Sequence, residues 1–228
     1  MRVTYYGHSC FLVELKGKKI LFDPFITPNP LAANVKPEQI AADYIFLSHA
    51  HNDHTADALM LAKQTDAAIV GVWEIHAWAQ RNGIKKTHPM NIGGTFDFEF
   101  GMVKMVNAVH SSSFDDGSYG GQAAGFYIES EEGNFYYAGD TALHYDMKLL
   151  GKHFDIDIAF LPIGSNFTMG IDDAMIASKY IKCDKIIGMH YDTFGYIKID
   201  HALAKKKFTD QDKELILMEI GTTKEFTF

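Results

Sequence analysis

The segment that most constrains this chain is residues 48–54, which read Ser-His-Ala-His-Asn-Asp-His and directly follow the apolar residues 44–47. Three imidazoles and one carboxylate therefore come at the end of a predicted strand. Imidazole nitrogens and carboxylate oxygens are the ligands that borderline cations such as Zn²⁺ prefer. The chain holds only 11 histidines among 228 residues, so we interpret this clustering as part of a metal site.

The spacing divides these ligands into two pairs. His49 and His51 are two residues apart, so in an extended strand end their side chains point to the same side. Asp53 and His54 are adjacent, and they face the same space only if the chain turns after His51. Residues 55–64 are rich in Ala and Leu and predict a helix after that turn. Neither pair fills a tetrahedral site, so further ligands must come from elsewhere.

Three other apolar segments each end next to a suitable ligand: His110, Asp140 and His190. In α/β proteins the carboxyl ends of strands are where binding sites form. We therefore expect these three side chains to join the histidines of residues 48–54 in one site.

Taken together, these residues resemble the signature of the metallo-β-lactamase superfamily, which is H-x-H-x-D-H followed by later His, Asp and His ligands. Residues 7–11, Gly-His-Ser-Cys-Phe, make the chain more similar to the UPF0173-like family of small prokaryotic metal-dependent hydrolases. The resemblance runs over essentially the whole chain. It implies an α/β (α+β) fold, namely the four-layer αββα sandwich of the metallo-β-lactamase fold, and a single hydrolase domain over residues 1–228.

The resemblance also implies a role for each ligand. One divalent ion would bind His49, His51 and His110. A second would bind Asp53, His54 and His190, and Asp140 would bridge the two ions. The histidine-rich set suits Zn²⁺ best, and Mn²⁺ or Fe²⁺ are the alternatives.

Two cations held close together suggest a hydrolytic mechanism. A single Zn²⁺ can lower the pKa of a bound water from 15.7 to about 7. The resulting metal-bridging hydroxide would attack a small-molecule ester, lactone, thioester or phosphodiester. We predict two catalytic side chains besides the ligands, Asp53 to orient the hydroxide and His8 to line the site. Candidates for donating a proton to the leaving group are His8, Tyr191, Asp192 and Thr193.

Two other classes of protein were compared with the hydrolase. A di-iron redox protein on this fold would carry Glu in place of His51 and a flavin-binding partner domain. A non-enzymatic metal-binding or regulatory protein would have lost some ligands, whereas all seven positions are filled here. Both alternatives therefore rank below the hydrolase.

Composition and charge restrict the partners. The formal net charge is −8, and the only basic run is residues 205–207, which we interpret as the solvated end of a helix. We expect a small-molecule substrate, no nucleic acid, no membrane and a cytoplasmic location, with a homo-oligomer left open. Cys10 and Cys183 both lie among apolar residues, which predicts two buried, reduced thiols.

A weak internal repeat predicts how the chain is organised. Residues 17–23 resemble 133–140, residues 42–47 resemble 156–161, and residues 67–71 resemble 184–188. We interpret this as two βα halves that face each other with the ligands at their junction. Strands beginning near Tyr44, Ile69 and Phe96 would belong to the first half.

Some local features carry separate predictions. Asp172 and Asp200 are predicted N-caps of helices over residues 172–181 and 201–207. His88 precedes Pro89 in a predicted turn. His144, four residues after Asp140, is a weaker candidate for lining the site.

Overall fold

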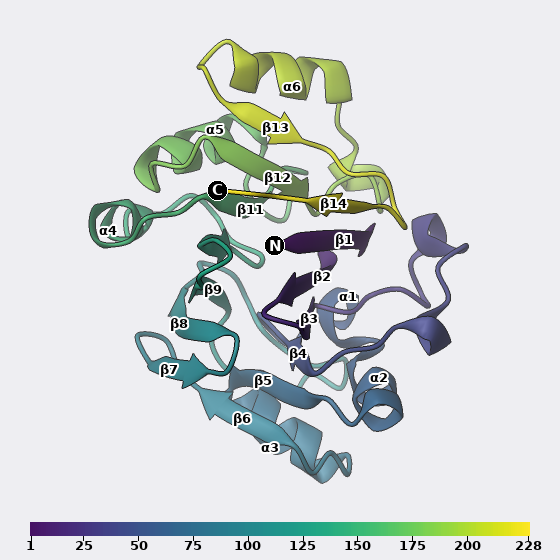
Figure 1. Cartoon of the computed structure of the whole chain (residues 1–228). Helices are drawn as coiled ribbons and strands as arrows, with labels where there is room; N and C mark the ends of the chain where they lie inside the picture. The colour runs from purple at the N-terminus through teal and green to yellow at the C-terminus, as the bar shows by residue number, and fades with distance from the viewer.

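The computed structural model describes residues 1–228 and contains two seven-stranded sheets packed against each other, with helices on their outer sides (Figure 1). The first sheet has the order β14-β1-β2-β3-β4-β5-β6. Its strands are β1 (Arg2–Gly7), β2 (Cys10–Leu15), β3 (Lys18–Phe22), β4 (Tyr44–Phe46), β5 (Ala68–Val72), β6 (Thr87–Met90) and β14 (Thr223–Glu225).

The second sheet has the order β13-β12-β11-β10-β9-β8-β7. Its strands are β7 (Thr95–Phe98), β8 (Gly101–Asn107), β9 (Ala124–Glu129), β10 (Phe135–Tyr137), β11 (Ile158–Pro162), β12 (Lys185–Met189) and β13 (Glu214–Ile216). The α-helices are α1 (Asn52–Thr55), α2 (Ala58–Thr65), α3 (Trp73–Arg81), α4 (Met147–His153), α5 (Ile171–Tyr180) and α6 (His201–Thr209), and short 3₁₀ turns cover Pro30–Ala32, Pro37–Gln39 and Gly195–Ile197.

The two sheets repeat one topology. In the first, β1, β2 and β3 are antiparallel neighbours and β3 to β6 are parallel. In the second, β8, β9 and β10 are antiparallel and β10 to β13 are parallel. The predicted arrangement of two equivalent halves is therefore confirmed, with β3 corresponding to β10.

Aromatic side chains join the two sheets into one core. Phe22 of β3 stacks on Tyr137 of β10 with ring centroids 4.5 Å apart. Phe46 of β4 meets Phe126 of β9 edge to face at 5.0 Å. Because these four rings are fully buried, they contribute a large apolar area to the contact between the sheets.

Helices complete the outer layers. α2 and α3 pack on the first sheet, and α5 and α6 pack on the second (Figure 1). The predicted four-layer αββα sandwich is thus confirmed.

Two predictions about strands were wrong. The strand at Phe96 is β7, which belongs to the second sheet, because the chain reverses at once and pairs Phe96 with Val103 of β8. His88 and Pro89 lie in β6 rather than in a turn. β6 is the edge strand of its sheet, where the missing N–H of proline is tolerated.

Helix boundaries were predicted with mixed success. The helix expected over residues 55–64 is split into α1 and α2, because Asp57 at the break accepts hydrogen bonds from the amides of Ile26 and Thr27. Asp172 is not an N-cap: α5 begins at Ile171 and Asp172 lies in its first turn. Asp200 does cap α6, accepting from the amide of Leu203 at 3.0 Å.

Candidate metal centre

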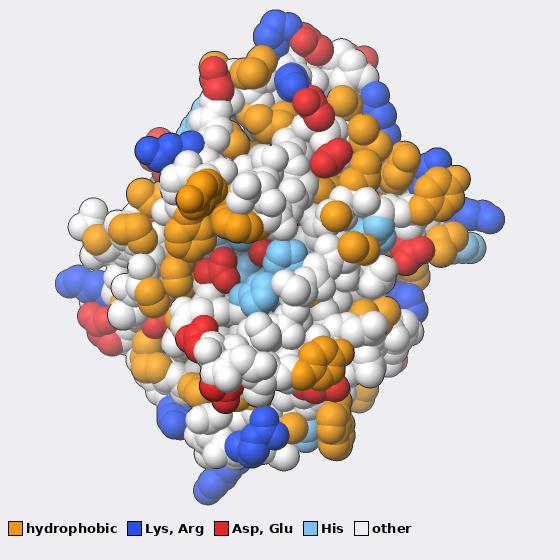
Figure 2. Space-filling view, turned by 180° about the vertical axis from the view of Figure 1, so that it is seen from behind, with side chains coloured by type: hydrophobic (Ala, Val, Ile, Leu, Met, Phe, Trp, Pro, Cys, Tyr) orange, Lys and Arg blue, Asp and Glu red, His pale blue; other side chains and the backbone are white.

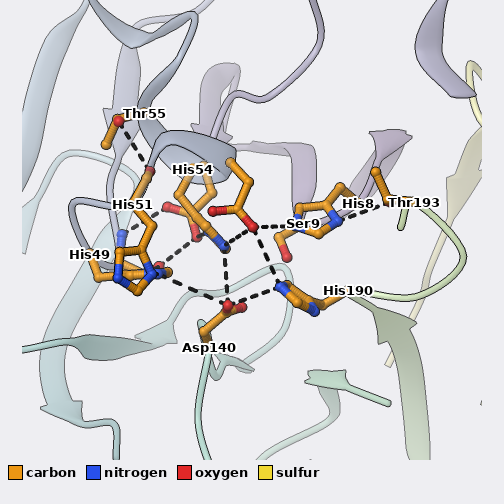
Figure 3. Close-up of polar contacts among 12 residues, drawn as sticks. His8, Ser9, His49, His51, His54, Thr55, Asp140, His190 and Thr193 are labelled. Carbon is orange, nitrogen blue, oxygen red and sulfur yellow. Dashed lines mark hydrogen bonds and ion pairs between the residues drawn. The ribbon is translucent and has the colours of Figure 1, made fainter. Parts of the chain in front are cut away.

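All seven predicted ligands lie at one edge of the sandwich, where strands of both sheets end. Figure 3 shows His49, His51, His54, Asp140 and His190 gathered there. In the first sheet, β4 leads into the four ligands of residues 49–54. In the second, β8, β10 and β12 lead to His110, Asp140 and His190. Because β8, β10 and β12 run in the same direction, their carboxyl ends meet at this edge.

Three residues at this edge have backbones in the left-handed region, which costs a non-glycine residue of order 1–3 kcal/mol. They are His8 with φ 57°, Asp23 with φ 42° and His190 with φ 55°. Each follows its strand directly, and the positive φ redirects the chain at that point. Such strain in three residues around one centre is typical of a functional site.

The donor atoms fall into three groups, within each of which all lie within 4.8 Å of one another. The first group is His49, His51 and His110. The second is His8, Asp53, His54 and His190, and the third is His49, His54 and Asp140. The structure therefore brings together the two predicted ligand triads, and it adds His8 to the second.

Asp140 lies between the triads. Its Oδ2 is 3.0 Å from Nε2 of His190 and 3.3 Å from Nε2 of His54. The same oxygen is 3.5 Å from Nε2 of His110 and 4.0 Å from Nε2 of His49. One carboxylate oxygen thus faces imidazoles from both sheets.

The unpaired polar atoms of the centre suit divalent cations. Nε2 of His54 and Oδ1 of Asp140 are buried without a hydrogen-bond partner. An unsatisfied buried group costs about 1–3 kcal/mol, so a centre with such atoms needs a further partner. Nitrogen and carboxylate donors at this spacing fit a cation of the first transition row.

The electrostatic surroundings shift the pKa values of these imidazoles in different directions. Burial lowers the pKa of His49 well below its usual value, and it also lowers the pKa of His51 and His110. Burial acts in the same direction on His190, but Asp140 and Asp53 outweigh it and raise its pKa to about 9. The first triad therefore holds neutral imidazoles, the form that binds metal.

Asp23, which follows β3, supports the ligands and was not predicted from the sequence as a residue of the site. Its Oδ2 accepts from Nδ1 of His54 at 2.8 Å, from Oγ of Ser48 at 2.6 Å and from the hydroxyl of Tyr137 at 2.7 Å. Ser48 Oγ also lies 3.0 Å from Nδ1 of His49. Since both Nδ1 atoms are engaged in this way, the Nε2 atoms of His49 and His54 are left facing the centre.

His8 contacts the second triad. Its Nε2 lies 3.1 Å from Oδ2 of Asp53, and its Nδ1 lies 2.9 Å from Oγ1 of Thr193. The ring is buried, whereas the side chain of Asp53 is 24% exposed. His8 thus contacts a predicted ligand, as expected for a residue that lines or supports the site.

The other proton-donor candidates are placed differently. Thr193 lines the cavity above the centre. Asp192 instead pairs with His201, with 2.6 Å between Oδ2 and Nε2, and Tyr191 is buried beside the same imidazole. His144 lines a separate cavity between β8 and α4.

A cavity of about 660 Å³ opens over the centre. Figure 2 shows histidine and acidic side chains at the bottom of a hollow, with hydrophobic side chains beside it. The cavity is lined by His51, Asp53, His110, Ser111, Asp140, Phe167, His190, Thr193, Phe194, Gly195 and Tyr196. Five of these residues were not predicted from the sequence: Ser111, Phe167, Phe194, Gly195 and Tyr196.

Comparison with known proteins identifies the family. The pattern of the Beta-lactamase superfamily domain matches residues 2–190. The chain belongs to the metallo-β-lactamase superfamily. Two relatives within it are a UPF0173 metal-dependent hydrolase of Christiangramia forsetii, 56% identical, and one of Flavobacterium johnsoniae, 53% identical. Each alignment covers 99% of this chain and 100% of the relative.

A solved structure with the metallo-β-lactamase fold superposes on this chain over almost its whole length. Igni18, a metallo hydrolase from the archaeon Ignicoccus hospitalis, superposes with a TM-score of 0.89 at 33% identity, covering 99% of both chains. The protein is therefore a metal-dependent hydrolase of the metallo-β-lactamase superfamily. None of its helices combines the length and the apolar character needed to cross a membrane.

Proposed function

We propose that the protein is a dinuclear hydrolase that cleaves an ester, lactone or phosphodiester bond in a small molecule. The position of Asp140 carries this proposal. Its Oδ2 lies within 4.0 Å of imidazoles from both triads, so one carboxylate can be shared between two cations.

The residues divide between two ions as follows. His49, His51 and His110 would hold the first, Asp53, His54 and His190 would hold the second, and Asp140 would contact both. Zn²⁺ is the favoured ion, because it binds well to sets of three nitrogen or oxygen ligands. When bound, such ions lower the pKa of water and polarise the bond to be cleaved.

Asp53 and His8 act next to the reacting atoms. Asp53 Oδ2 faces His8 at 3.1 Å and His190 at 3.7 Å, and its side chain reaches the cavity. An Nε2–H of His8 that donates to Asp53 fixes the direction of that carboxylate. This tautomer leaves Nδ1 of His8 to accept from the hydroxyl of Thr193.

Elemental analysis together with a substrate panel tests the proposal. We expect two divalent ions per chain and turnover of at least one class among chromogenic esters, lactones and phosphodiesters. His190→Ala should remove metal and activity together, while His153→Ala, an exposed residue of α4, should change neither. Two bound ions with no turnover on the whole panel would favour a metal-binding protein without hydrolytic function.

A further inference from the structure

The cavity over the centre has two chemically different sides. Its floor consists of the histidine and aspartate side chains described above. One wall consists of three aromatic side chains from two loops, Phe167 after β11 and Phe194 and Tyr196 after β12. We call Phe167, Phe194 and Tyr196 the aromatic wall.

Two rings of the aromatic wall face solvent. Phe167 is 50% exposed and Tyr196 is 79% exposed, and their centroids lie 6.3 Å apart in an edge-to-face arrangement. Covering a large aromatic side chain removes apolar surface from water, which is favourable in free energy. Their exposure at the rim of this cavity therefore leaves apolar surface that a bound molecule can cover.

The loops that carry the wall are fixed by hydrogen bonds. The amide of Ser165 donates to the carbonyl of Met169 at 3.0 Å, which closes the loop around Phe167. The amide of Asp192 donates to the carbonyl of Ile197 at 2.8 Å, which closes the loop around Tyr196. The backbone of both loops is therefore preformed, which reduces the entropy that they lose on binding.

Phe194 connects the wall to the centre. Its ring centroid lies 5.3 Å from that of His8 and 6.2 Å from that of Phe25. The wall is therefore continuous with the residues around the reacting bond.

Charge on the cavity lining limits what can bind. None of the eleven lining residues is Lys or Arg, and two of them, Asp53 and Asp140, are acidic. An anionic group placed away from the cations would lose its hydration without gaining a partner.

We propose that the substrate is an uncharged ester or lactone whose remaining part is apolar and packs against Phe167 and Tyr196. This inference rests on the proposed hydrolase function and narrows the class of its substrate. It places neutral carboxylic esters ahead of esters that carry a remote carboxylate.

A matched pair of substrates tests the selection. 4-Nitrophenyl hexanoate and mono-4-nitrophenyl adipate share the scissile bond and the chain length, and differ by a remote carboxylate. We expect kcat/KM to be at least about 10-fold higher for the hexanoate. An equal or higher value for the adipate overturns the proposal.

The aromatic wall is tested by the double variant Phe167→Ala/Tyr196→Ala. We expect KM for the hexanoate to rise about 10-fold, with kcat and metal content nearly unchanged. Because both side chains are largely exposed, the variant should fold normally. Leu203→Ala, which removes a 47% exposed side chain on α6, is the matched control and should leave KM unchanged.

A binding measurement separates this inference from the proposed function. Benzyl alcohol is neutral and aromatic and has no bond to hydrolyse, so saturation-transfer NMR reports its binding without turnover. We expect a signal with the natural protein that the double variant loses. If no substrate is turned over, the proposed function fails. The NMR result still tests whether the aromatic wall binds apolar groups, and equal signals from both proteins would overturn that inference.

Discussion

Asp23 and His54 form a fully buried pair in which Oδ2 of the carboxylate lies 2.8 Å from Nδ1 of the imidazole. Asp23 also accepts from the amide and hydroxyl of Ser48. This carboxylate therefore fixes the ring orientation of one predicted metal ligand directly, and that of His49 through Ser48.

The variant Asp23→Asn tests this relationship. The amide keeps the shape of the carboxylate but carries no charge. Its NH₂ group is a donor, and the neighbouring groups that Asp23 accepts from are donors too. We expect metal affinity, measured by competition with a chelator, to fall about 10- to 100-fold. Asp57→Asn is the control, because Asp57 is also buried but bonds only backbone amides. Equal losses of affinity in the two variants would contradict the assignment of Asp23.

Replacement of Asp140 addresses the shared carboxylate. Asp140→Ala removes the carboxylate whose Oδ2 lies within 4.0 Å of imidazoles in both triads. We expect the metal content to drop below two ions per chain and the hydrolysis rate to fall by about 10² or more. Asp184→Ala removes an exposed partner of Lys213 and serves as the control. Unchanged stoichiometry and rate would remove Asp140 from the centre.

Metal binding should raise the thermal stability of the protein. An ion present at 100 times its Kd stabilises the native state by about 2.7 kcal/mol. For a chain of this length each kcal/mol shifts the melting temperature by about 2–4 °C, so one ion predicts a shift of roughly 5–11 °C. Differential scanning calorimetry with and without chelator measures it. Asp140→Ala should show a smaller shift, and a melting temperature insensitive to metal would count against the site.

His8→Gln distinguishes a positioning residue from a metal ligand. His8 lies 3.1 Å from Asp53 and belongs to the same donor group as the second triad. If His8 positions Asp53, kcat should fall about 10- to 100-fold while metal content is kept. Thr193→Val removes only the partner of Nδ1 and should have a smaller effect. Loss of one ion from His8→Gln would make His8 a ligand instead.

Both cysteines should be unreactive in the native protein. Burial raises the pKa of Cys10 well above its usual value and that of Cys183 to about 12. Only the thiolate reacts, and at pH 8 a thiol with a pKa near 12 has about 10³-fold less of it than an ordinary cysteine. We expect slow labelling by a thiol reagent at pH 8, and two reactive thiols per chain in denaturant. Fast labelling of the folded protein would show that one site opens.

The ligands could be predicted because their signal is local. Residues 49–54 combine four ligands, three His and one Asp, in one short segment, and His110, Asp140 and His190 each follow a recognisable apolar strand. Asp23 gave no such signal, because a single Asp after a strand is common and its partners are distant in sequence. Only the repeat, which aligns the segments ending at Asp23 and Asp140, pointed towards it.

The details that were missed depend on distant contacts. Asp57 interrupts the predicted helix because it bonds amides of residues 26 and 27, about 30 positions away. Phe167 and Tyr196 become neighbours only when the loops after β11 and β12 meet. Periodicity and composition describe short windows and contain no information on such pairs.

The last strand, β14, pairs with β1 although the entire second sheet precedes it in the chain. A growing polypeptide leaving the ribosome can therefore assemble the second sheet before the first has its outermost strand. Because the chain returns from the second sheet to add β14 to the first, this pairing also holds the two halves together. Proteolytic cleavage between β6 and β7 would leave two fragments that stay associated, because the carboxyl-terminal fragment supplies a strand to the amino-terminal one.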